Sequence, residues 1–291
     1  MRRIFFLCGL GLCSVLVLAG AARTSPSFQF TSIDFPGAVL TNVQGINPGG
    51  EMVGFYRDTA GKQHGFSLSG ANFSSIDYPG AISTSARGIN PGGGIVGSYT
   101  NAPGGPPNVH GFLLSQGLIS EVQYPNSLGT IPQRIGPNGD IYGCVHDMDL
   151  MGSMHGFVRN ANGYSILDLK ASMHNGATPD GRVIVGLYTD MMTSLSHGYV
   201  IDNGNFASLD VPNSNFTRGW DINPAGNIVG EFRDTTGKFH GFLRTANGFS
   251  GIDFPGAIAT SAFGINSRGD VVGSYTDAGG KTHGYLLSMA N

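Results

Sequence analysis

The sequence predicts an all-β fold, a six-bladed β-propeller of four-stranded blades in which the N-terminal strand completes the last blade. Three observations support this prediction. A His-Gly-aromatic tripeptide occurs six times at intervals of 42 to 46 residues, and a turn sequence recurs with the same period. Glycine accounts for 47 of the 291 residues, while only 12% of the residues are charged. Such a composition is typical of many short strands joined by tight turns.

The first residues have the features of a secretory signal peptide. Arg2 and Arg3 precede an apolar run from Ile4 to Leu18, and the small residues 19–21 match the pattern of a cleavage site. The run is short for a membrane span, and no other segment is apolar enough to cross a bilayer. We therefore expect a signal peptide at residues 1–21, a single domain at residues 22–291, and secretion to the extracellular space or the periplasm.

Charge and cysteine content narrow the possible binding partners and disulfide bonds. Without Arg2 and Arg3, the 16 basic residues become 14 against 19 acidic residues, a net charge near −5. This balance argues against nucleic acid as the main partner. Cys8 and Cys13 lie in the leader, so Cys144 would be the single cysteine of the mature chain, and no intramolecular disulfide could form.

Each repeat contains four segments with the character of strands. In the last repeat the first three are Ala262 to Asn266, Val271 to Thr276 and His283 to Ser288. A turn such as residues 47–50 separates the first two, because proline presets φ at the second turn position and glycine suits the fourth. A glycine in every second strand indicates a close backbone approach. These glycines are Gly54, Gly97, Gly143, Gly186, Gly230 and Gly273.

The fourth segment of each repeat is extended and also occurs before the first repeat. Pairing the early copy, Phe28 to Pro36, with the strand at His283 would complete a sixth blade and remove an exposed sheet edge. The closing strand of a propeller is usually outermost, which makes the Gly-Ile-Asn segments innermost. An open β-solenoid is the alternative, but it would leave the N-terminal strand without a partner. The extended segments are Ile33 to Pro36, Ile76 to Pro79, Val122 to Pro125, Ile166 to Leu169, Leu209 to Pro212 and Ile252 to Pro255.

The order Gly-Ile-Asn, turn, Val-Gly and His-Gly-Phe resembles the HAF-type extracellular repeat family. The resemblance covers residues from about 28 to 291, with glycine where the family name has alanine. It implies secretion and a repeat architecture. It implies no established activity.

The six repeat histidines are predicted to be structural, because a role in every blade is expected of packing or hydrogen bonding rather than of a metal ring. They are His64, His110, His155, His197, His240 and His283. Each is expected to pair with an Asx side chain four residues after the second-strand glycine. The expected partners are Asp58, Asn101, Asp147, Asp190, Asp234 and Asp277. The periodic Asp34, Asp77, Asp168, Asp210 and Asp253 are also expected to be structural.

Candidate ligand contacts lie where the repeats differ. The residue just before the Gly-Ile-Asn segment varies between repeats, and the predicted phase places it at the start of the innermost strand, near the mouth of the central channel. Amides, one arginine and two aromatic rings there suit a glycan or another polar ligand. Relaxed sequence constraint is the alternative reason for the variety. The residues are Gln44, Arg87, Gln133, Asn175, Trp220 and Phe263.

A second candidate is a methionine-rich loop in the third repeat. Thioether and imidazole ligands suit Cu(I), and Cys144 is nearby. The alternative is an adaptable apolar loop that uses methionine as filler. The candidate ligands are His146, Met148, Met151, Met154 and His155, with Met191 and Met192 in the matching loop of the next repeat.

No motif of a common catalytic class is present. The sequence lacks Gly-x-Ser-x-Gly, His-Glu-x-x-His, a phosphate-binding glycine loop and a cysteine pair. It therefore predicts a monomeric, non-enzymatic binding or scaffold protein without a cofactor, whose partner is a glycan, a small polar ligand or a protein. The alternative is a propeller hydrolase or lyase acting on extracellular glycans or small lactones. Two carboxylates, or a histidine with an arginine, meeting at the channel mouth would favour the enzyme.

Overall fold

The computed structural model describes residues 28–105, 108–146, 154–167, 169 and 171–289, which form 24 β-strands and no helix. The predicted signal peptide at residues 1–21 lies outside this part of the chain. Within the same ranges, no helix long and apolar enough to cross a membrane is present. The strands coincide with short runs rich in valine, isoleucine, phenylalanine and tyrosine, which favour a pleated, half-buried surface.

The strands group into four-stranded antiparallel blades, each formed by strands that are consecutive in the chain except for the last. The first three blades are β2 (Leu40–Ile46), β3 (Met52–Arg57), β4 (Gln63–Ser69) and β5 (Asn72–Ile76); β6 (Ser83–Ile89), β7 (Ile95–Thr100), β8 (Val109–Ser115) and β9 (Leu118–Val122); and β10 (Gly129–Ile135), β11 (Ile141–His146), β12 (Met154–Asn160) and β13 (Gly163–Ile166). The next are β14 (Ser172–Ala177), β15 (Val183–Thr189), β16 (Ser196–Asp202) and β17 (Asn205–Leu209); β18 (Phe216–Ile222), β19 (Ile228–Arg233), β20 (Phe239–Thr245) and β21 (Gly248–Ile252); and β22 (Ala259–Ile265), β23 (Val271–Thr276) and β24 (Thr282–Met289), to which β1 (Phe28–Ile33) is added.

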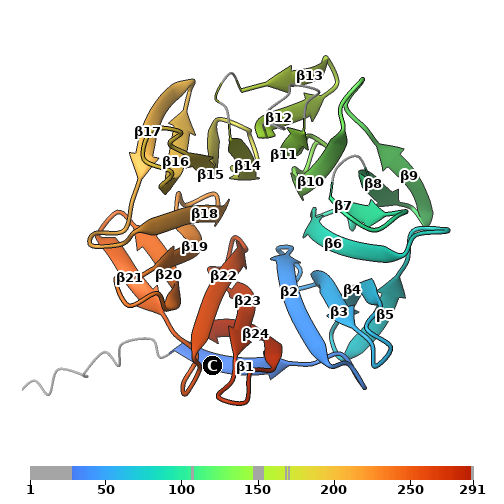
Figure 1. Cartoon of the computed structure of the whole chain (residues 1–291), viewed down its shortest axis with the longest axis horizontal. Coiled ribbons are helices and arrows are strands. Elements are labelled where there is room, and N and C mark those ends of the chain that lie inside the picture. The colour runs from blue at the N-terminus through green and yellow to red at the C-terminus, as the bar shows by residue number, and fades with distance from the viewer. Residues whose placement is uncertain (1–27, 106–107, 147–153, 168, 170, 290–291) are drawn as a thin grey trace, which may run out of the picture.

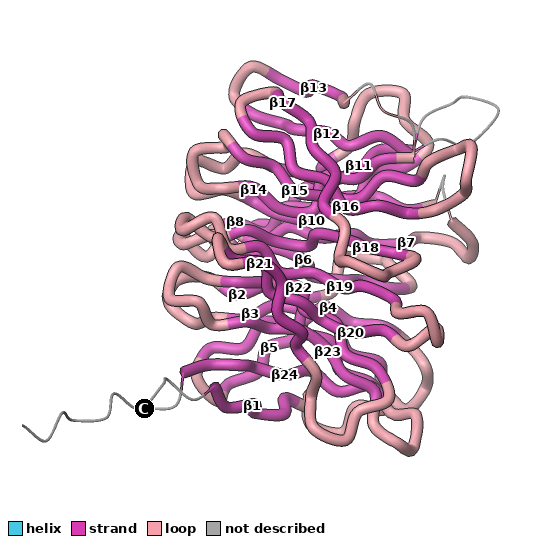
Figure 2. Tube along the Cα trace, turned by 90° about the vertical axis from the view of Figure 1, so that its left-hand side faces the viewer, coloured by secondary structure: helices cyan, strands magenta, loops and turns pink. Residues whose placement is uncertain are grey.

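The blades are arranged around a central axis, as in a β-propeller (Figure 1). The first strand of each blade is innermost, and these strands also contact one another: β2, for example, touches both β6 and β22. Seen from the side, the strands lie between two opposite faces on which the loops gather (Figure 2). The predicted strand order within a blade is therefore correct.

The N-terminal strand pairs with the end of the chain, as the phase of the repeats predicts. β1 lies antiparallel to β24, with Phe28 opposite Met289 and Ile33 opposite Gly284. The predicted extended segments, however, start too late. β5 ends at Ile76, and the following Asp-aromatic pair already leaves the blade, because its aromatic ring packs on the neighbouring blade.

Aromatic rings join neighbouring blades at the end of the outer strands. Tyr78 follows β5 and stacks on Tyr99 of β7 with ring centroids 3.6 Å apart. Phe35 follows β1 and stacks on Tyr56 of β3 at the same distance. β1 therefore connects to its neighbour in the same way as an outer strand in the middle of the chain.

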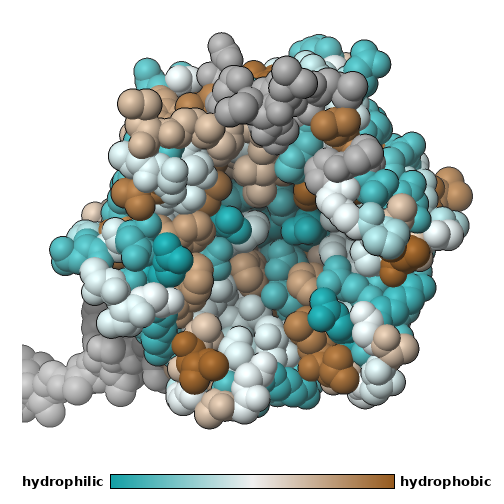
Figure 3. Space-filling view, in the orientation of Figure 1, coloured by the Kyte–Doolittle hydropathy of each residue, from teal (hydrophilic) through white to brown (hydrophobic). Residues whose placement is uncertain are grey.

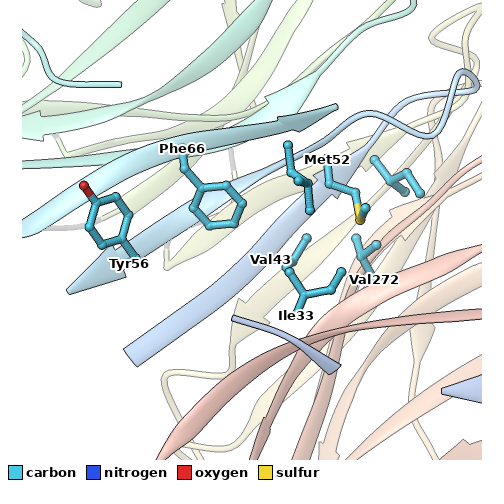
Figure 4. Packing of buried hydrophobic residues seen from close by; sticks show 8 residues of the cluster. Ile33, Val43, Met52, Tyr56, Phe66 and Val272 are labelled. Atoms are coloured by element: carbon cyan, nitrogen blue, oxygen red, sulfur yellow. The ribbon is translucent and has the colours of Figure 1, made fainter. Parts of the chain in front are cut away.

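The hydrophobic core lies between blades. In one cluster, Ile33 of β1 and Val272 of β23 pack against Val43, Met52 and Phe66 of the adjacent blade (Figure 4). Each large side chain removed from water in this way contributes roughly 2 kcal/mol. The core thus fixes how blades sit against each other, while hydrogen bonds fix the strands within a blade.

Tight turns hold the innermost and second strands together. In the first blade, Asn47 accepts the N–H of Gly50 through its carbonyl oxygen (3.0 Å) and the N–H of Glu51 through its side chain (3.0 Å). Gly50 has a φ of 89°, a left-handed conformation that costs glycine little. The predicted Asn-Pro-Gly-Gly turn is therefore correct in type and place.

Candidate functional site

Every innermost strand contains a β-bulge, and the predicted ligand contacts are the bulged residues. In β2 the pairing with β3 shifts between Val43 and Gly45, which leaves Gln44 without a partner. A bulge bends the strand and re-aims the side chain of the extra residue. The same shift brackets Arg87, Gln133, Asn175, Trp220 and Phe263.

The structure places these side chains deeper than the sequence suggests. They lie past the middle of the innermost strands rather than at the start. For example, β2 runs from Leu40 to Ile46, and Gln44 lies in its second half. Only Arg87 is partly exposed to solvent, whereas the others are buried: Gln44, Gln133, Asn175, Trp220 and Phe263. Their service as ligand contacts remains a prediction.

Bulged residues contact the innermost strand of the neighbouring blade. Arg87 donates from Nη1 to Oε1 of Gln133 at 3.4 Å, and Gln133 donates from Nε2 to the sulfur of Met173 at 3.3 Å. Asn175 donates to the carbonyl oxygen of Gly219 at 2.9 Å. The bulges therefore bring one side chain from each blade into a ring around the axis.

Two polar atoms of this ring are buried without a hydrogen-bond partner. The indole Nε1 of Trp220 and the amide Oδ1 of Asn175 have none among the described residues. The Trp220 ring packs perpendicular to Phe263, with centroids 5.2 Å apart. Because buried polar groups are almost always satisfied, each of these unpaired atoms marks a place where a polar ligand or water can bind.

A buried ion pair, which the sequence analysis missed, crosses the axis next to the bulged residues. Arg134 of β10 places Nε 3.3 Å from Oδ2 of Asp221 in β18. Burial raises the pKa of Asp221, while Arg134 and the backbone N–H groups of Ile265 and Ile222 act against that rise. Both residues occupy the position that is glycine in other repeats, such as Gly45.

Backbone carbonyl groups accept hydrogen bonds from both terminal nitrogens of the Arg134 guanidinium. It donates to the carbonyl oxygens of Arg87 (3.0 Å), Gln133 (2.8 Å) and Gln44 (3.1 Å), and to that of Phe263. Four innermost strands are thus tied to one side chain. The sequence signal for this ion pair was the replacement of the repeated Gly-Ile by Arg134-Ile135 and Asp221-Ile222. That the two residues contact each other could be seen only in the arrangement of the blades.

An apolar cup opens on one side of this ion pair. It has a volume of about 240 Å³, and Arg134 and Asp221 supply its charged lining. The turn residues Pro48 and Pro91 are among those at its edge. Figure 3 shows one face of the molecule, hollowed at its centre, where hydrophilic and hydrophobic residues are mixed. The aliphatic lining consists of Ile46, Ile89, Ile135, Ile222 and Ile265, with the smaller Ala177 in the remaining repeat.

A second ion pair joins β18 to β19 of the same blade. Nη1 of Arg218 is 3.5 Å from Oε1 of Glu231, and Glu231 also accepts a hydrogen bond from Ser261 at 2.7 Å. The Arg218 guanidinium lies 4.8 Å over the Trp220 ring, on the same face of β18. Both channel carboxylates, Asp221 and Glu231, are therefore already paired with an arginine.

No activated nucleophile is present in the described part of the channel. Cys144 is buried, and burial raises the pKa of its thiol to about 12. The thiol is protonated at neutral pH and therefore a poor nucleophile.

The repeat histidines have the structural surroundings that the sequence predicts. His283 contacts Asp277 through Nε2 (3.2 Å) and stacks on Tyr275 with centroids 4.9 Å apart. Its Nδ1 binds Asp34 at 2.8 Å, a second partner that was not predicted. The predicted pairing also occurs at His64–Asp58, His110–Asn101 and His240–Asp234.

Two predicted histidine partners have other outcomes. Asp190 accepts the backbone N–H of Met192 at 2.8 Å, while His197 binds Asp210 at 3.1 Å. Asp147 lies outside the described residues, as does Asp168. The aspartates that directly follow the outer strands were expected to be structural. They thus orient the imidazoles of the adjacent third strands.

The methionine-rich loop is only partly covered by the structure. Met148 and Met151 lie outside the described residues, His146 is opposite Met154 in the β11–β12 ladder, and Nδ1 of His155 is 3.3 Å from the carbonyl oxygen of Leu167. Met191 and Met192 are exposed. Among the residues described, no group of three or more His, Cys, Asp or Glu side chains could hold a metal. The copper site remains a prediction.

No protein-family model matches the chain, and no curated protein matches it. Similar solved structures do exist. TolB from Acinetobacter baumannii has a TM-score of 0.55 and 12% identity over 82% of this chain and 63% of that chain, so the chain spans less than two thirds of TolB. AofleA from Arthrobotrys oligospora has a TM-score of 0.52 and 12% identity over 93% of this chain and 92% of that chain.

A third similar structure is a variant of the Aleuria aurantia lectin in complex with Fucα1-6GlcNAc. Its TM-score is 0.52, with 10% identity over 86% of this chain and 94% of that chain. At these identities the likeness concerns the fold alone. The chain shares the β-propeller fold with these proteins.

Proposed function

We propose that this protein is a closed six-bladed β-propeller that is secreted and binds a small polar ligand or glycan in its central channel without catalysis. The observation that carries the proposal is the ring of bulged side chains, which contains an unpaired N–H at Trp220 and an unpaired carbonyl at Asn175. A few placed polar atoms without protein partners, set among apolar side chains, are typical of a ligand-binding site.

Closure of the ring is supported by contacts at the join between the two ends of the chain. β1 extends the blade of β22 to β24, and Phe35 then packs on Tyr56 as Tyr78 packs on Tyr99. β2 touches β22 as well as β6. The join therefore has the same aromatic stack as the boundary between the blades of β5 and β7.

Binding is favoured over the rival hydrolase or lyase by the state of the channel carboxylates. Asp221 is held by Arg134 and two backbone N–H groups, and Glu231 by Arg218 and Ser261. A general acid or base must reach the proton that it transfers, and a carboxylate committed to structural partners is poorly placed for that role.

Location and ligand class rest on two further supports. The leader at residues 1–21 and the resemblance to the HAF-type extracellular repeats support secretion, to the periplasm or beyond the cell. A lectin that was solved with a fucosylated glycan has the same fold, which supports a glycan among the possible ligands. We also propose that the mature protein is a monomer.

A glycan array with the mature chain, residues 22–291, tests the proposal. Trp220 is the single tryptophan of the chain, so a ligand in the channel should change its fluorescence. We expect glycans that score on the array to shift this emission. Calorimetry should show at least tenfold weaker binding to Trp220→Phe, which keeps an aromatic ring beside Phe263 but removes the N–H.

The matched control is Phe206→Leu, because Phe206 is an exposed aromatic residue on the outer strand β17. This change should leave affinity unaltered. Array ligands that bind Trp220→Phe as tightly as the native protein, without a change in native tryptophan emission, would place the binding surface elsewhere and overturn the proposal.

A further inference from the structure

The channel contains more positive than negative groups. Three arginines, Arg87, Arg134 and Arg218, extend from the innermost strands, against two carboxylates, Asp221 and Glu231. Arg134 and Arg218 each have a carboxylate within ion-pair distance. Among the described residues, Arg87 has none, and its side chain donates to the neutral Ser98 (3.2 Å) and Gln133 (3.4 Å).

The Arg87 charge has cationic neighbours. Partial burial, together with the charges of Arg134 and Arg218, lowers the pKa of Arg87 to about 10. The group nevertheless remains protonated at neutral pH. Arg134 links the two innermost strands that carry these groups, because its Nη1 donates to the carbonyl oxygen of Arg87 (3.0 Å) and its Nε lies 3.3 Å from Oδ2 of Asp221, on the strand of Arg218. An uncompensated charge in such a place is unfavourable.

Unused hydrogen-bond donors lie beside these arginines. Nε of Arg218 and Nε1 of Trp220 are both buried without an acceptor, and the guanidinium lies over the indole. A carboxylate has two oxygens that accept several hydrogen bonds, and charge-assisted bonds to guanidinium are the strongest of this kind. A carboxylate would therefore satisfy both the unused donors and the unpaired charge.

The same region offers one unused acceptor. Oδ1 of Asn175 has no partner, and its Nδ2 binds the carbonyl oxygen of Gly219, the residue before Trp220. A hydroxyl group next to the carboxylate of a ligand would satisfy it. Arg87 and Arg218 keep partly exposed side chains, so solvent reaches this level of the channel.

We propose that the channel ligand is a hydroxy-carboxylate, whose carboxylate binds between Arg87 and Arg218 with Trp220 as an added donor, and whose hydroxyl binds Asn175. This inference rests on the proposed function, because it specifies the ligand of the same channel. The chemistry is shared by an acidic sugar and by a free hydroxy acid.

Titrations of the mature protein monitored by Trp220 fluorescence and by calorimetry test the inference. The probes are glucuronate, its neutral counterpart glucose, and the non-sugar hydroxy acid lactate, all at constant ionic strength. We expect glucuronate to bind at least tenfold more tightly than glucose. Lactate binding as tightly as glucuronate would identify a free hydroxy acid as the source, and much weaker lactate binding would identify an acidic sugar.

Arg87→Gln removes the charge but keeps a polar side chain near Ser98 and Gln133. It should weaken glucuronate binding at least tenfold and leave glucose binding unchanged. Arg244→Gln, at an exposed position on β20, is the matched control and should have no effect. Equal losses in both variants would reveal only diffuse surface attraction and would overturn the inference.

A second measurement needs no ligand. Without an anion, Arg87→Gln should melt at a temperature equal to or higher than the native protein, because it removes an unpaired charge from the channel. A lower melting temperature would show that the charge is already compensated and would overturn the inference. Glucose and glucuronate binding equally, with a change in Trp220 emission, would contradict the anion site but leave the proposed channel binding intact. If no array glycan and no probe binds, both proposals fail.

Discussion

At the scale of single residues, environment gives one residue type two different roles. The repeat histidines, such as His283, lie near the surface between two aspartates and an aromatic ring. His174 is outside the repeat pattern and is buried against Tyr199. The Tyr199 hydroxyl donates to the carbonyl oxygen of Met173 (2.9 Å) and so can accept from Nδ1–H of His174. This network holds a neutral imidazole.

His174 should therefore make the protein sensitive to acid. Burial lowers the pKa of His174 to about 4, below its ordinary value of 6.5. Between these values the unfolded chain binds a proton that the folded chain does not, so stability falls as pH decreases from about 6.5 to about 4. The limiting loss is on the order of 3 kcal/mol. Urea unfolding at several pH values should show this slope in the native protein and a flatter one in His174→Gln. Parallel slopes would exclude His174 as the cause.

At the scale of the secondary-structure element, the second strand of each blade is fitted to the bulge of the innermost strand. A Cβ added at Gly230 would lie 2.0 Å from the carbonyl oxygen of Arg218 and 2.5 Å from the Phe242 ring. The other second-strand glycines have the same close contact, including Gly54 with Asn42. The predicted close approach of backbones is thus confirmed, and its cause is the carbonyl group next to the bulge.

Gly230→Ala should therefore destabilise the protein strongly. The backbone oxygen cannot move without breaking the β18–β19 ladder, so we expect a loss of about 3 kcal/mol or more in the free energy of unfolding. Gly251→Ala is the matched control, because the nearest atom to an added Cβ on this outer strand is 4.0 Å away. It should change stability by less than about 0.5 kcal/mol. Similar losses in the two variants, measured by urea unfolding, would contradict the packing argument.

At the scale of the whole molecule, stability depends on the strand that joins the two ends of the chain. β1 covers the outer edge of β24, and Ile33 and Phe35 pack on the next blade. Without them, β24 would present a row of unpaired backbone groups, a template for association with another chain. The pairing also spans nearly the full length of the chain, so no local contact can replace it.

Removal of residues 22–36 should lower the melting temperature and promote oligomers. We expect a cost of several kcal/mol, comparable to roughly two lost core side chains plus a row of hydrogen bonds. Calorimetry and light scattering would compare chains 22–291 and 37–291. A synthetic peptide of residues 28–36 should restore melting temperature in trans. A truncated chain that stays monomeric and melts like the longer one would argue against ring closure.

Much of the architecture was accessible from the sequence. The period of the His-Gly-aromatic tripeptide, the turn at Asn47 and the spare strand at Phe28 predict the blades, their strand order and the β1–β24 pairing. These features follow from local chemistry, since turn residues and β-prone runs act over a few positions. The repeat histidines were likewise interpretable, because His64, His110, His240 and His283 share the same short-range pairing.

The contents of the channel were decided by the tertiary structure. The sequence marks Arg87 and Trp220 as variable, but the bulges aim them inward, and that shift depends on pairing with the second strand. Arg134 and Asp221 are far apart in the chain and meet only because their innermost strands face the same axis. The sequence by itself thus determined the blades, whose contacts are local and repeated. Only the packing of blades around the axis decided which side chains share the channel, because these contacts join single, non-repeated residues from different blades.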